Sequence, residues 1–302
     1  MKLLALLIGL AVERLATQLF HLRELRWLDR VIDSGFEQVN RFANWPPLLL
    51  VLLLAIVLVL PVALVRVMLG DALFGFPYLL FAVFVLFFSF GPKDIGEEVN
   101  EYCAALESGD EARIRRSGKV LLEREPLPES DARVNEIEAA VCVQANNRLF
   151  AVIFWFVVLG PLGAWGYRVT DLIRRRAVFN AARDESSTSA ASLCVTAAED
   201  LQGWIAWIPA RLTAVSFAMA GNFDAAITAW RTGGNVGVPP GVQNENLLAR
   251  VGLGALAVPE AEDESSAERG ARGALAANRL VFRSLLIWAA VIAAMTLYGW
   301  SV

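Results

Sequence analysis

Histidine and cysteine are scarce in this 302-residue chain, which has one histidine, His21, and three cysteines, Cys103, Cys142 and Cys194. A single histidine excludes metal sites built from several histidines, and it leaves Ser-His-Asp chemistry dependent on one residue near the N-terminus. The cysteines are far apart and form no C-x-x-C pair, so the sequence indicates neither a zinc site nor a redox motif. We therefore expect three small buried thiols and no bound metal.

Motifs for phosphate binding and hydrolysis are also missing. Gly118-Lys119 lacks the upstream glycine and the following Ser or Thr of a Walker loop, and G-x-G-x-x-G, G-x-S-x-G and H-E-x-x-H do not occur. The formal net charge is −4, and the basic residues are scattered among acids, which is not the charge pattern of a nucleic-acid-binding protein. We expect no nucleic-acid partner, no cofactor and no catalytic residue of these classes.

Long charge-free runs are what the sequence does contain. The chain is 56% hydrophobic, and four runs of 19 residues, 47–65, 72–90, 149–167 and 284–302, carry no charged side chain. As helices they would each extend roughly 28 Å, close to the ~30 Å hydrocarbon core of a bilayer. Backbone polar groups in lipid must be satisfied internally, which favours helices. The sequence thus predicts an all-α, multi-pass membrane protein with hydrophilic helical subdomains packed on the spans and the lipid bilayer as a partner.

Polarity divides the chain into six predicted segments. They are N-terminal amphipathic or interfacial helices (1–45), a transmembrane hairpin (46–91), a hydrophilic helical segment (92–148), a broken or re-entrant membrane helix (149–167), a second hydrophilic helical segment (168–283) that contains the apolar stretch 201–220, and a C-terminal transmembrane helix (284–302). The apolar residues 3–12 are too few to span a bilayer. Glu13 follows them without a small-x-small cleavage site, so we expect a retained helix there.

Turn and cap signals place the hydrophilic helices. We expect helices over 94–107 and 111–123 around a Ser-Gly-Asp turn, with Asp110 capping the second, and a third helix capped by Ser130 or Asp131. This third helix leads directly into the run 149–167. Two serine-rich polar stretches, 184–192 and 259–270, predict solvated loops.

The middle of the third apolar run contains Gly160-Pro161-Leu162-Gly163. Proline removes a helical hydrogen bond, so the run is either a kinked span or a broken, re-entrant helix. Arginines follow this run and precede the last one, which by the positive-inside rule makes both flanks cytoplasmic. The N-terminal segment is also arginine-rich, and re-entry at 160–163 would place both regions on the same side.

Polar groups beside the membrane segments are the candidate site. Arg211 lies in the otherwise apolar stretch 201–220, which we expect to dip into the interface or pack on the spans, and there it requires a buried carboxylate, a carbonyl or an anionic ligand. Both a structural ion pair and a ligand-binding role remain open for this arginine. The candidate ligand-binding residues are Arg211, Asn146, Asn147, Glu138, Asp171 and Glu13.

Short motifs carry a family resemblance. They are I-P-A-R-L at 208–212, Phe154-Trp155 followed by G-P-L-G-A at 160–164 and Tyr167-Arg168, and L-A-V-E-R-L at 10–15. The chain resembles the AmpE family, bacterial inner-membrane proteins linked to the regulation of β-lactamase induction. More distantly it is similar to the CobD/CbiB adenosylcobinamide-phosphate synthases. The resemblance implies a non-catalytic regulator that responds to cell-wall status, with an anionic or cell-wall-derived small molecule and a signalling protein as partners, and with cytoplasmic hydrophilic segments.

The sequence departs from the synthases at their acidic motifs. Their E-N-x-x-D signature is replaced by V-Q-A-N-N at 143–147, and their paired aspartates and asparagine by Gln202, Gly203 and Ala206, so that only Pro209 and Arg211 of that site are kept. Carboxylates suited to metal or acid–base work have become neutral. A membrane-bound synthase forming an amide bond on a large anionic substrate is thus the alternative. A transporter would need polar groups at the bilayer midplane, which three of the four runs lack.

Overall fold

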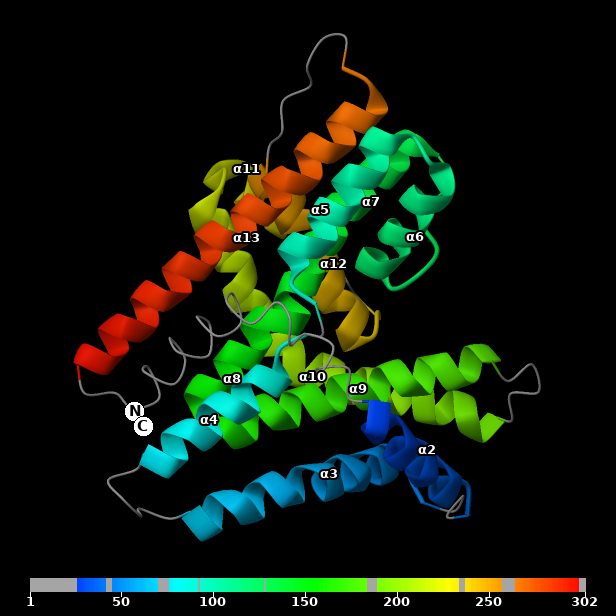
Figure 1. Ribbon diagram of the computed structural model, residues 1–302, viewed down its shortest axis with the longest axis vertical. Helices are drawn as coiled ribbons and strands as arrows, with labels where there is room; N and C mark the ends of the chain where they lie inside the picture. Colours follow the sequence, from blue (N-terminus) through cyan, green and yellow to red (C-terminus); the bar gives the residue numbers. More distant parts are fainter. Residues whose placement is uncertain are drawn as a thin grey trace.

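The computed structural model describes residues 26–41, 45–69, 76–91, 93–127, 129–183, 189–233, 237–256 and 264–298. All regular elements in these ranges are helices (Figure 1). They are α2 (Arg26–Arg41), α3 (Pro47–Leu69), α4 (Phe76–Ser89), α5 (Ile95–Ser108), α6 (Glu111–Leu122), α7 (Ser130–Ala145), the π-helical turn η3 (Asn146–Phe150), α8 (Ala151–Leu159), α9 (Pro161–Arg183), α10 (Ser189–Ala220), α11 (Phe223–Arg231), α12 (Pro240–Leu256) and α13 (Ser266–Leu297). The predicted N-terminal residues Glu13 and His21 lie outside the described residues. The predicted all-α fold is confirmed.

Three helical stretches in the described part are long and apolar enough to cross a membrane: Pro47–Leu69, Ala132–Leu159 and Ser266–Leu297. Only 17% of the most apolar window of α3 is buried, against 61% for the middle stretch. Thus α3 presents its side chains to lipid, whereas protein surrounds the middle stretch. Of the predicted run 72–90, residues 76–89 form α4, which extends roughly 21 Å, and residues 72–75 lie outside the described residues.

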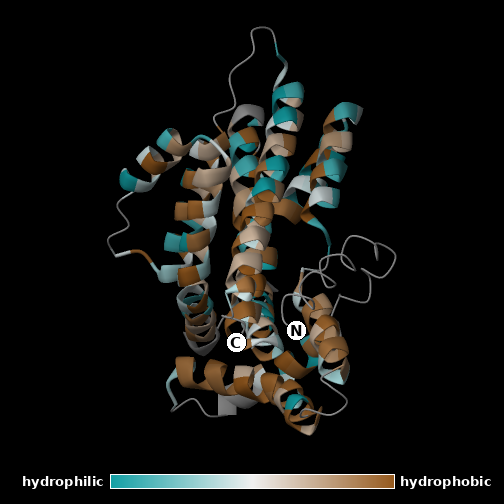
Figure 2. Cartoon of the chain, turned by 90° about the vertical axis from the view of Figure 1, so that its left-hand side faces the viewer, coloured by the Kyte–Doolittle hydropathy of each residue, from teal (hydrophilic) through white to brown (hydrophobic). Residues whose placement is uncertain are grey.

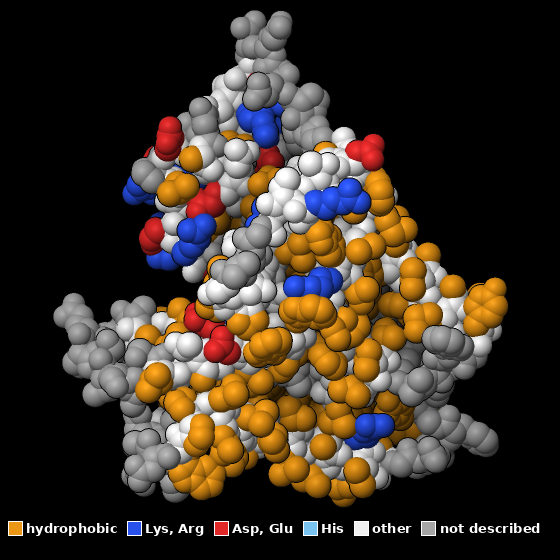
Figure 3. Space-filling view, turned by 180° about the vertical axis from the view of Figure 1, so that it is seen from behind, with side chains coloured by type: hydrophobic (Ala, Val, Ile, Leu, Met, Phe, Trp, Pro, Cys, Tyr) orange, Lys and Arg blue, Asp and Glu red, His pale blue; other side chains and the backbone are white. Residues whose placement is uncertain are grey.

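Apolar and polar surfaces occupy different parts of the molecule. In Figure 2 the lower part of the molecule is strongly hydrophobic, and hydrophilic residues gather in the upper part. The back face in Figure 3 is covered below by hydrophobic side chains, with acidic and basic side chains concentrated above. This segregation is that of a protein with one part in a bilayer and another in water.

Three large hydrophobic cores hold the described helices together, beside a small fourth cluster of Leu50 and Cys194. The largest joins α5, α7, α12 and α13 with the C-terminal half of α10. A second joins α4, α8 and the start of α9, and a third joins α2 and α3 with α9 and the N-terminal half of α10. Because α9 and α10 contribute to more than one core, the region between them is where the membrane part and the polar part of the molecule meet.

The chain turns back at Gly160. This residue has φ 70° and ψ −152°, a conformation that glycine adopts readily, and α8 ends just before it. Pro161 begins α9, which returns along α8, so that a Cβ on Gly163 would lie 2.2 Å from the carbonyl oxygen of Trp155. Phe156 and Tyr167 accordingly share one core. The segment is a helical hairpin, and its re-entry into the membrane stays a prediction.

Helix ends test the predicted caps and loops. The carboxylate of Asp110 accepts hydrogen bonds from the backbone amides of Ala112 and Arg113, which confirms the predicted cap. The predicted caps of the third helix are wrong, because α7 already begins at Ser130 and its N-cap position is Glu129, without a side-chain cap bond.

Part of each predicted loop is helical, and residues 184–188 and 259–263 lie outside the described residues. The helix α10 begins at Ser189, and α13 begins at Ser266. Ser265 caps α13 by accepting from the backbone amide of Glu268, whose side chain accepts in turn from the backbone of Ser265. This is a capping box, in which two otherwise unpaired amides are satisfied. The polarity of these residues therefore reflects the start of a helix and not a solvated loop.

Candidate functional site

Arg148 projects from the π-helical turn η3 into the protein. Its Nη1 donates to Oε2 of Glu98 at 2.7 Å, and its Nε donates to Oε1 of Gln144 at 2.9 Å. The side chains of Arg148 and Glu98 are only 5% and 3% exposed. Burial raises the pKa of the Glu98 carboxyl, and Arg148 opposes this rise. Charges removed from water are stable only when paired, so this contact fixes α5 against the helix that enters the apolar region.

Asp171 is the centre of a second set of ion pairs, all on α9. Its Oδ2 accepts from Nη1 of Arg168 at 2.9 Å and from Nε of Arg175 at 2.8 Å, and its Oδ1 accepts from Nη2 of Arg174 at 3.2 Å. These positions are three or four residues from Asp171, the spacing at which helical side chains meet. Burial raises the pKa of Asp171, but Arg175, Arg174 and Arg168 outweigh it and hold the pKa well below its usual range.

Glu123 joins the two sets. Its Oε1 lies 2.5 Å from Nη1 of Arg175 and 3.4 Å from Nη2 of Arg148, and its Oε2 lies 3.6 Å from Nη2 of Arg174. It ends α6 with φ 59°, the one positive φ of a non-glycine residue among the described residues. Such a conformation costs about 1–3 kcal/mol and persists only where contacts enforce it. The three arginines are those contacts.

We call Arg148, Arg168, Arg174 and Arg175 the arginine cluster. Its four guanidinium groups are bonded to three carboxylates, and Glu245, at an exposed position of α12, acts on Arg174 at longer range.

Two buried donor groups of the arginine cluster have no hydrogen-bond partner in the described part of the chain. They are Nε of Arg168 and Nη2 of Arg175. The hydroxyl of Tyr167 and the side chain of Gln202 lie against each other, and Oε1 of Gln202 accepts from Thr170 at 2.6 Å. Both guanidinium atoms carry a hydrogen to donate, so the missing partners are acceptors. Buried polar groups are rarely left unpaired, which marks this place as suited to anionic oxygen atoms or ordered water.

Arg211 lies apart from the arginine cluster, on the C-terminal half of α10. Its Nη1 donates to the carbonyl of Trp207 at 3.0 Å and to Oδ1 of Asn244 at 3.1 Å, and its guanidinium carbon lies 3.7 Å from the centre of the Trp207 ring. The described carboxylates form no ion pair with it, so the structural ion pair considered above is wrong within these residues. A carbonyl, an amide and an aromatic face stabilise this arginine instead.

The remaining predicted residues do not converge on one site. Asn146 accepts from Oγ1 of Thr213 and donates to Oδ1 of Asn147, both at 3.1 Å. Glu138 is buried in an ion pair with Arg269 of α13. Asp171 alone of the predicted set lies in the arginine cluster, and Glu13 lies outside the described residues.

Sequence reasoning missed most of the arginine cluster. The arginines of α9 were interpreted only as topology markers, although their spacing around Asp171 was available as a signal. Glu98 and Glu123 gave no signal, because they lie 50 and 25 residues from Arg148. The described residues contain no group of three or more His, Cys, Asp or Glu arranged to hold a metal, and the three cysteines, all of them described, are buried and form no disulfide.

Comparisons with known proteins show similarity to two cobalamin biosynthesis proteins. The cobalamin biosynthesis protein CobD of Stutzerimonas stutzeri (strain A1501) is 26% identical over 217 residues, covering 69% of this chain and 68% of the relative. The protein of the same name from Chromobacterium violaceum is 27% identical over 178 residues, covering 58% of this chain and only 54% of the relative. No solved structure matches.

A family model described as the regulatory signalling modulator protein AmpE matches residues 1–302. Together with the three apolar helices, this match indicates a multi-pass inner-membrane protein in contact with the bilayer. The chain thus belongs to the AmpE family of regulatory signalling modulator proteins.

Proposed function

We propose that this protein is a non-catalytic regulator that binds an anionic, cell-wall-derived small molecule at the arginine cluster and thereby modulates β-lactamase induction. The family supports a regulatory membrane protein. The observation that carries the ligand proposal is the pair of unpartnered buried guanidinium donors, Nε of Arg168 and Nη2 of Arg175, on two arginines that contact Asp171. These N–H groups can donate to the oxygen atoms of a bound anion. The planar guanidinium group matches carboxylate or phosphate oxygens in geometry.

Glu123 supplies a physical route from binding to signalling. Its carboxylate contacts three arginines, and its side chain is 25% exposed, so it is more accessible than Glu98 or Asp171. An incoming anion would compete with Glu123 for the same guanidinium groups. Displacement of Glu123 would relieve the positive-φ conformation at the end of α6 and free this end of the helix from α9. The anion thus shifts an equilibrium between two states of α6, because it binds the state in which Glu123 has left the arginines.

The arginine-rich flanks support a cytoplasmic position for the arginine cluster, in line with the positive-inside rule. On this orientation α6 and its neighbours face the cytoplasm. The signalling partner would then read the position of α6, whose outer face carries Arg113, Arg115 and Arg116.

Inorganic pyrophosphate tests the anion site directly. In the purified full chain, pyrophosphate should raise the thermal unfolding temperature. The variant Arg175→Gln should lose this rise, whereas Arg231→Gln, on the exposed surface of α11, should keep it. Glu123→Gln removes the competing carboxylate and should tighten binding about tenfold, equivalent to ~1.4 kcal/mol. If pyrophosphate raised the unfolding temperature equally in the unmodified chain and in the Arg175→Gln, Arg231→Gln and Glu123→Gln variants, the anion site would be refuted.

The regulatory role needs a cellular readout. In a bacterium with an inducible chromosomal β-lactamase, replacing the native gene with the Glu123→Gln variant should change enzyme induction by a β-lactam, whereas Arg231→Gln should not. Unaltered induction in a strain without the gene would refute the role in β-lactamase regulation while leaving anion binding testable in vitro.

A synthase of the CobD type is the second candidate, favoured by the similarity to two cobalamin biosynthesis proteins. The neutral Gln202 and Gly203 bond here to Thr170 and Asn244, as structural links between α9, α10 and α12. Restored cobalamin synthesis in a cobD-deficient bacterium expressing this chain would support the synthase. Failure of a well-expressed chain to restore growth would support the regulator.

A further inference from the structure

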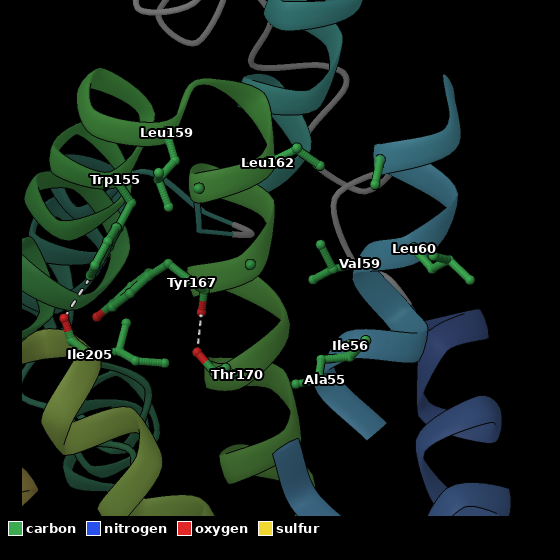
Figure 4. A pocket seen from close by; sticks show the side chains of 13 residues that line it. Ala55, Ile56, Val59, Leu60, Trp155, Leu159, Leu162, Tyr167, Thr170 and Ile205 are labelled. Carbon is green, nitrogen blue, oxygen red and sulfur yellow. Dashed lines mark hydrogen bonds between the residues drawn. The ribbon is translucent and has the colours of Figure 1, made fainter. Parts of the chain in front are cut away.

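A cleft runs between α3 on one side and the α8–α9 hairpin with α10 on the other (Figure 4). Its volume is about 340 Å³, and hydrocarbon side chains and glycines line it almost entirely. From α3 it is lined by Ala55, Ile56, Val59, Leu60 and Ala63, and from the opposite side chiefly by Trp155, Leu162, Gly166, Tyr167, Thr170 and Ile205.

Two tryptophan hydrogen bonds fix the walls of this cleft. Nε1 of Trp165 donates to the carbonyl oxygen of Leu58 at 3.0 Å and holds α3 at its distance from α9. Nε1 of Trp155 donates to the carbonyl oxygen of Ile205 at 3.2 Å and anchors its indole against α10. Buried indole N–H groups need such partners, so both rings are held in place. The cleft is therefore part of the packed fold.

Gly166 keeps the cleft open. A Cβ on this residue would meet only Cγ2 of Val59, at 3.9 Å, whereas a Cβ on Gly163 would collide with the backbone of α8. Gly163 is needed for close helix packing, and Gly166 is not. The missing side chain of Gly166 leaves space that neighbouring protein atoms do not fill.

The rim of the cleft indicates what fills it. Ile56, Leu60 and Leu159 are each more than half exposed, and α3 is a helix that faces lipid along most of its length. Water would find almost no polar partners in such a space and would need two to four. The opening of the cleft therefore faces the hydrocarbon chains of the bilayer.

The cleft lies between the helices, is open on the lipid-facing side of α3 and is lined almost entirely by hydrocarbon. A flexible hydrocarbon chain fits such a space without bringing unpaired polar groups into it. We propose that this cleft is a binding site for one acyl chain of a bilayer phospholipid, inserted between α3 and α9.

This inference is independent of the anion site, although the two adjoin. Tyr167 and Thr170 line the cleft, and Arg168 and Asp171 of the neighbouring ion pair follow them in α9. A bound acyl chain would thus contact the place where α9 packs on α10, next to the arginine cluster.

Photocrosslinking tests the acyl-chain site. The full chain is placed in nanodiscs of phosphatidylcholine that contains a diazirine on one acyl chain, and the labelled peptides are identified by mass spectrometry. Labelling should be several-fold higher on residues lining the cleft than on exposed α3 residues outside it. Gly166→Phe should remove this excess, and Leu64→Phe, at an exposed α3 position outside the cleft, should keep it.

Ala63→Phe fills the same cleft from α3 and serves as the second blocking variant if Gly166→Phe does not fold. Uniform labelling along α3, or an excess that persists in a folded blocking variant, would overturn the proposal. Crosslinks from the cleft to a second protein chain would also overturn it. Pyrophosphate binding is measured separately, so either proposal can fail alone.

Discussion

The buried pair of Glu98 and Arg148 gives the sharpest stability prediction. Removing one member of a buried ion pair typically costs 3–5 kcal/mol, because the other charge stays in a poorly solvated place. Glu98→Leu leaves Arg148 its contacts with Gln144 at 2.9 Å and Glu123 at 3.4 Å. We therefore expect the lower end, about 3 kcal/mol, or roughly 6–12 °C in the unfolding temperature.

The reverse variant has a pH signature. Arg148→Met leaves the Glu98 carboxyl buried, and burial already raises its pKa above the ordinary value of 4.5. The folded state then holds a proton that the unfolded state releases, so stability should be full below pH 4.5 and decline as pH rises toward the raised pKa. The double variant, with two apolar side chains in place of the charges, should recover most of the lost stability.

Thermal unfolding of the purified full chain in detergent, followed by circular dichroism, measures these effects. Glu101→Leu on the same helix is the control, because the contact of Glu101 with Lys93 is exposed and is worth about 0–1 kcal/mol. The double-mutant cycle should yield a coupling energy of at least ~2 kcal/mol. Additive effects, or a Glu98→Leu loss no larger than that of Glu101→Leu, would refute the reasoning.

Three further predictions follow from local geometry. Gly163→Ala places a Cβ 2.2 Å from a backbone oxygen of α8 and should cost about 1–3 kcal/mol in thermal unfolding, whereas Gly166→Ala should be nearly neutral; equal losses would contradict the hairpin packing. Ser265→Ala removes a capping box and should cost ~1 kcal/mol, with faster hydrogen exchange in the first turn of α13; unchanged exchange would argue against the cap. The hydrogen bond from Arg176 lowers the pKa of Asp33 below its ordinary value of 3.8. The Asp33–Arg176 contact therefore stabilises α2 above pH 3.8, and this stabilisation is lost as the pH falls through the lowered pKa. Hydrogen exchange in α2 should rise at low pH, and in the Asp33→Asn variant the exchange should already be raised at pH 7.

Sequence patterns predicted the helices well where one residue type decides the outcome. The charge-free run at 47–65 lies within α3. The Ser-Gly-Asp turn at 108–110 separates α5 from α6 at the expected place. Gly160-Pro161 breaks the third run because proline lacks the amide hydrogen that a continuous helix needs. These features depend on neighbours in sequence.

The site depended on distant neighbours and was largely missed. Periodicity shows which arginines share a face of α9, but it does not show that Glu98 and Glu123 arrive from another part of the chain to pair with Arg148. Arg211 stands out in the sequence as an arginine in an apolar stretch, and its partners are an amide and a carbonyl that no charge pattern reveals. Ion-pair partners are set by helix packing, which the pattern of a single sequence does not specify.

The π-helical turn at Asn146–Phe150 has a consequence for the joint between α7 and α8. An α-helix advances about 100° per residue, so the wider turn offsets the faces of the two helices by about one residue. The face by which α7 meets α13 and the face by which α8 meets α9 are therefore set independently. Deleting one residue within 146–150 would restore a regular helix and rotate one half of this long helix against the other, so the length of this segment, as well as its residue types, is under structural constraint.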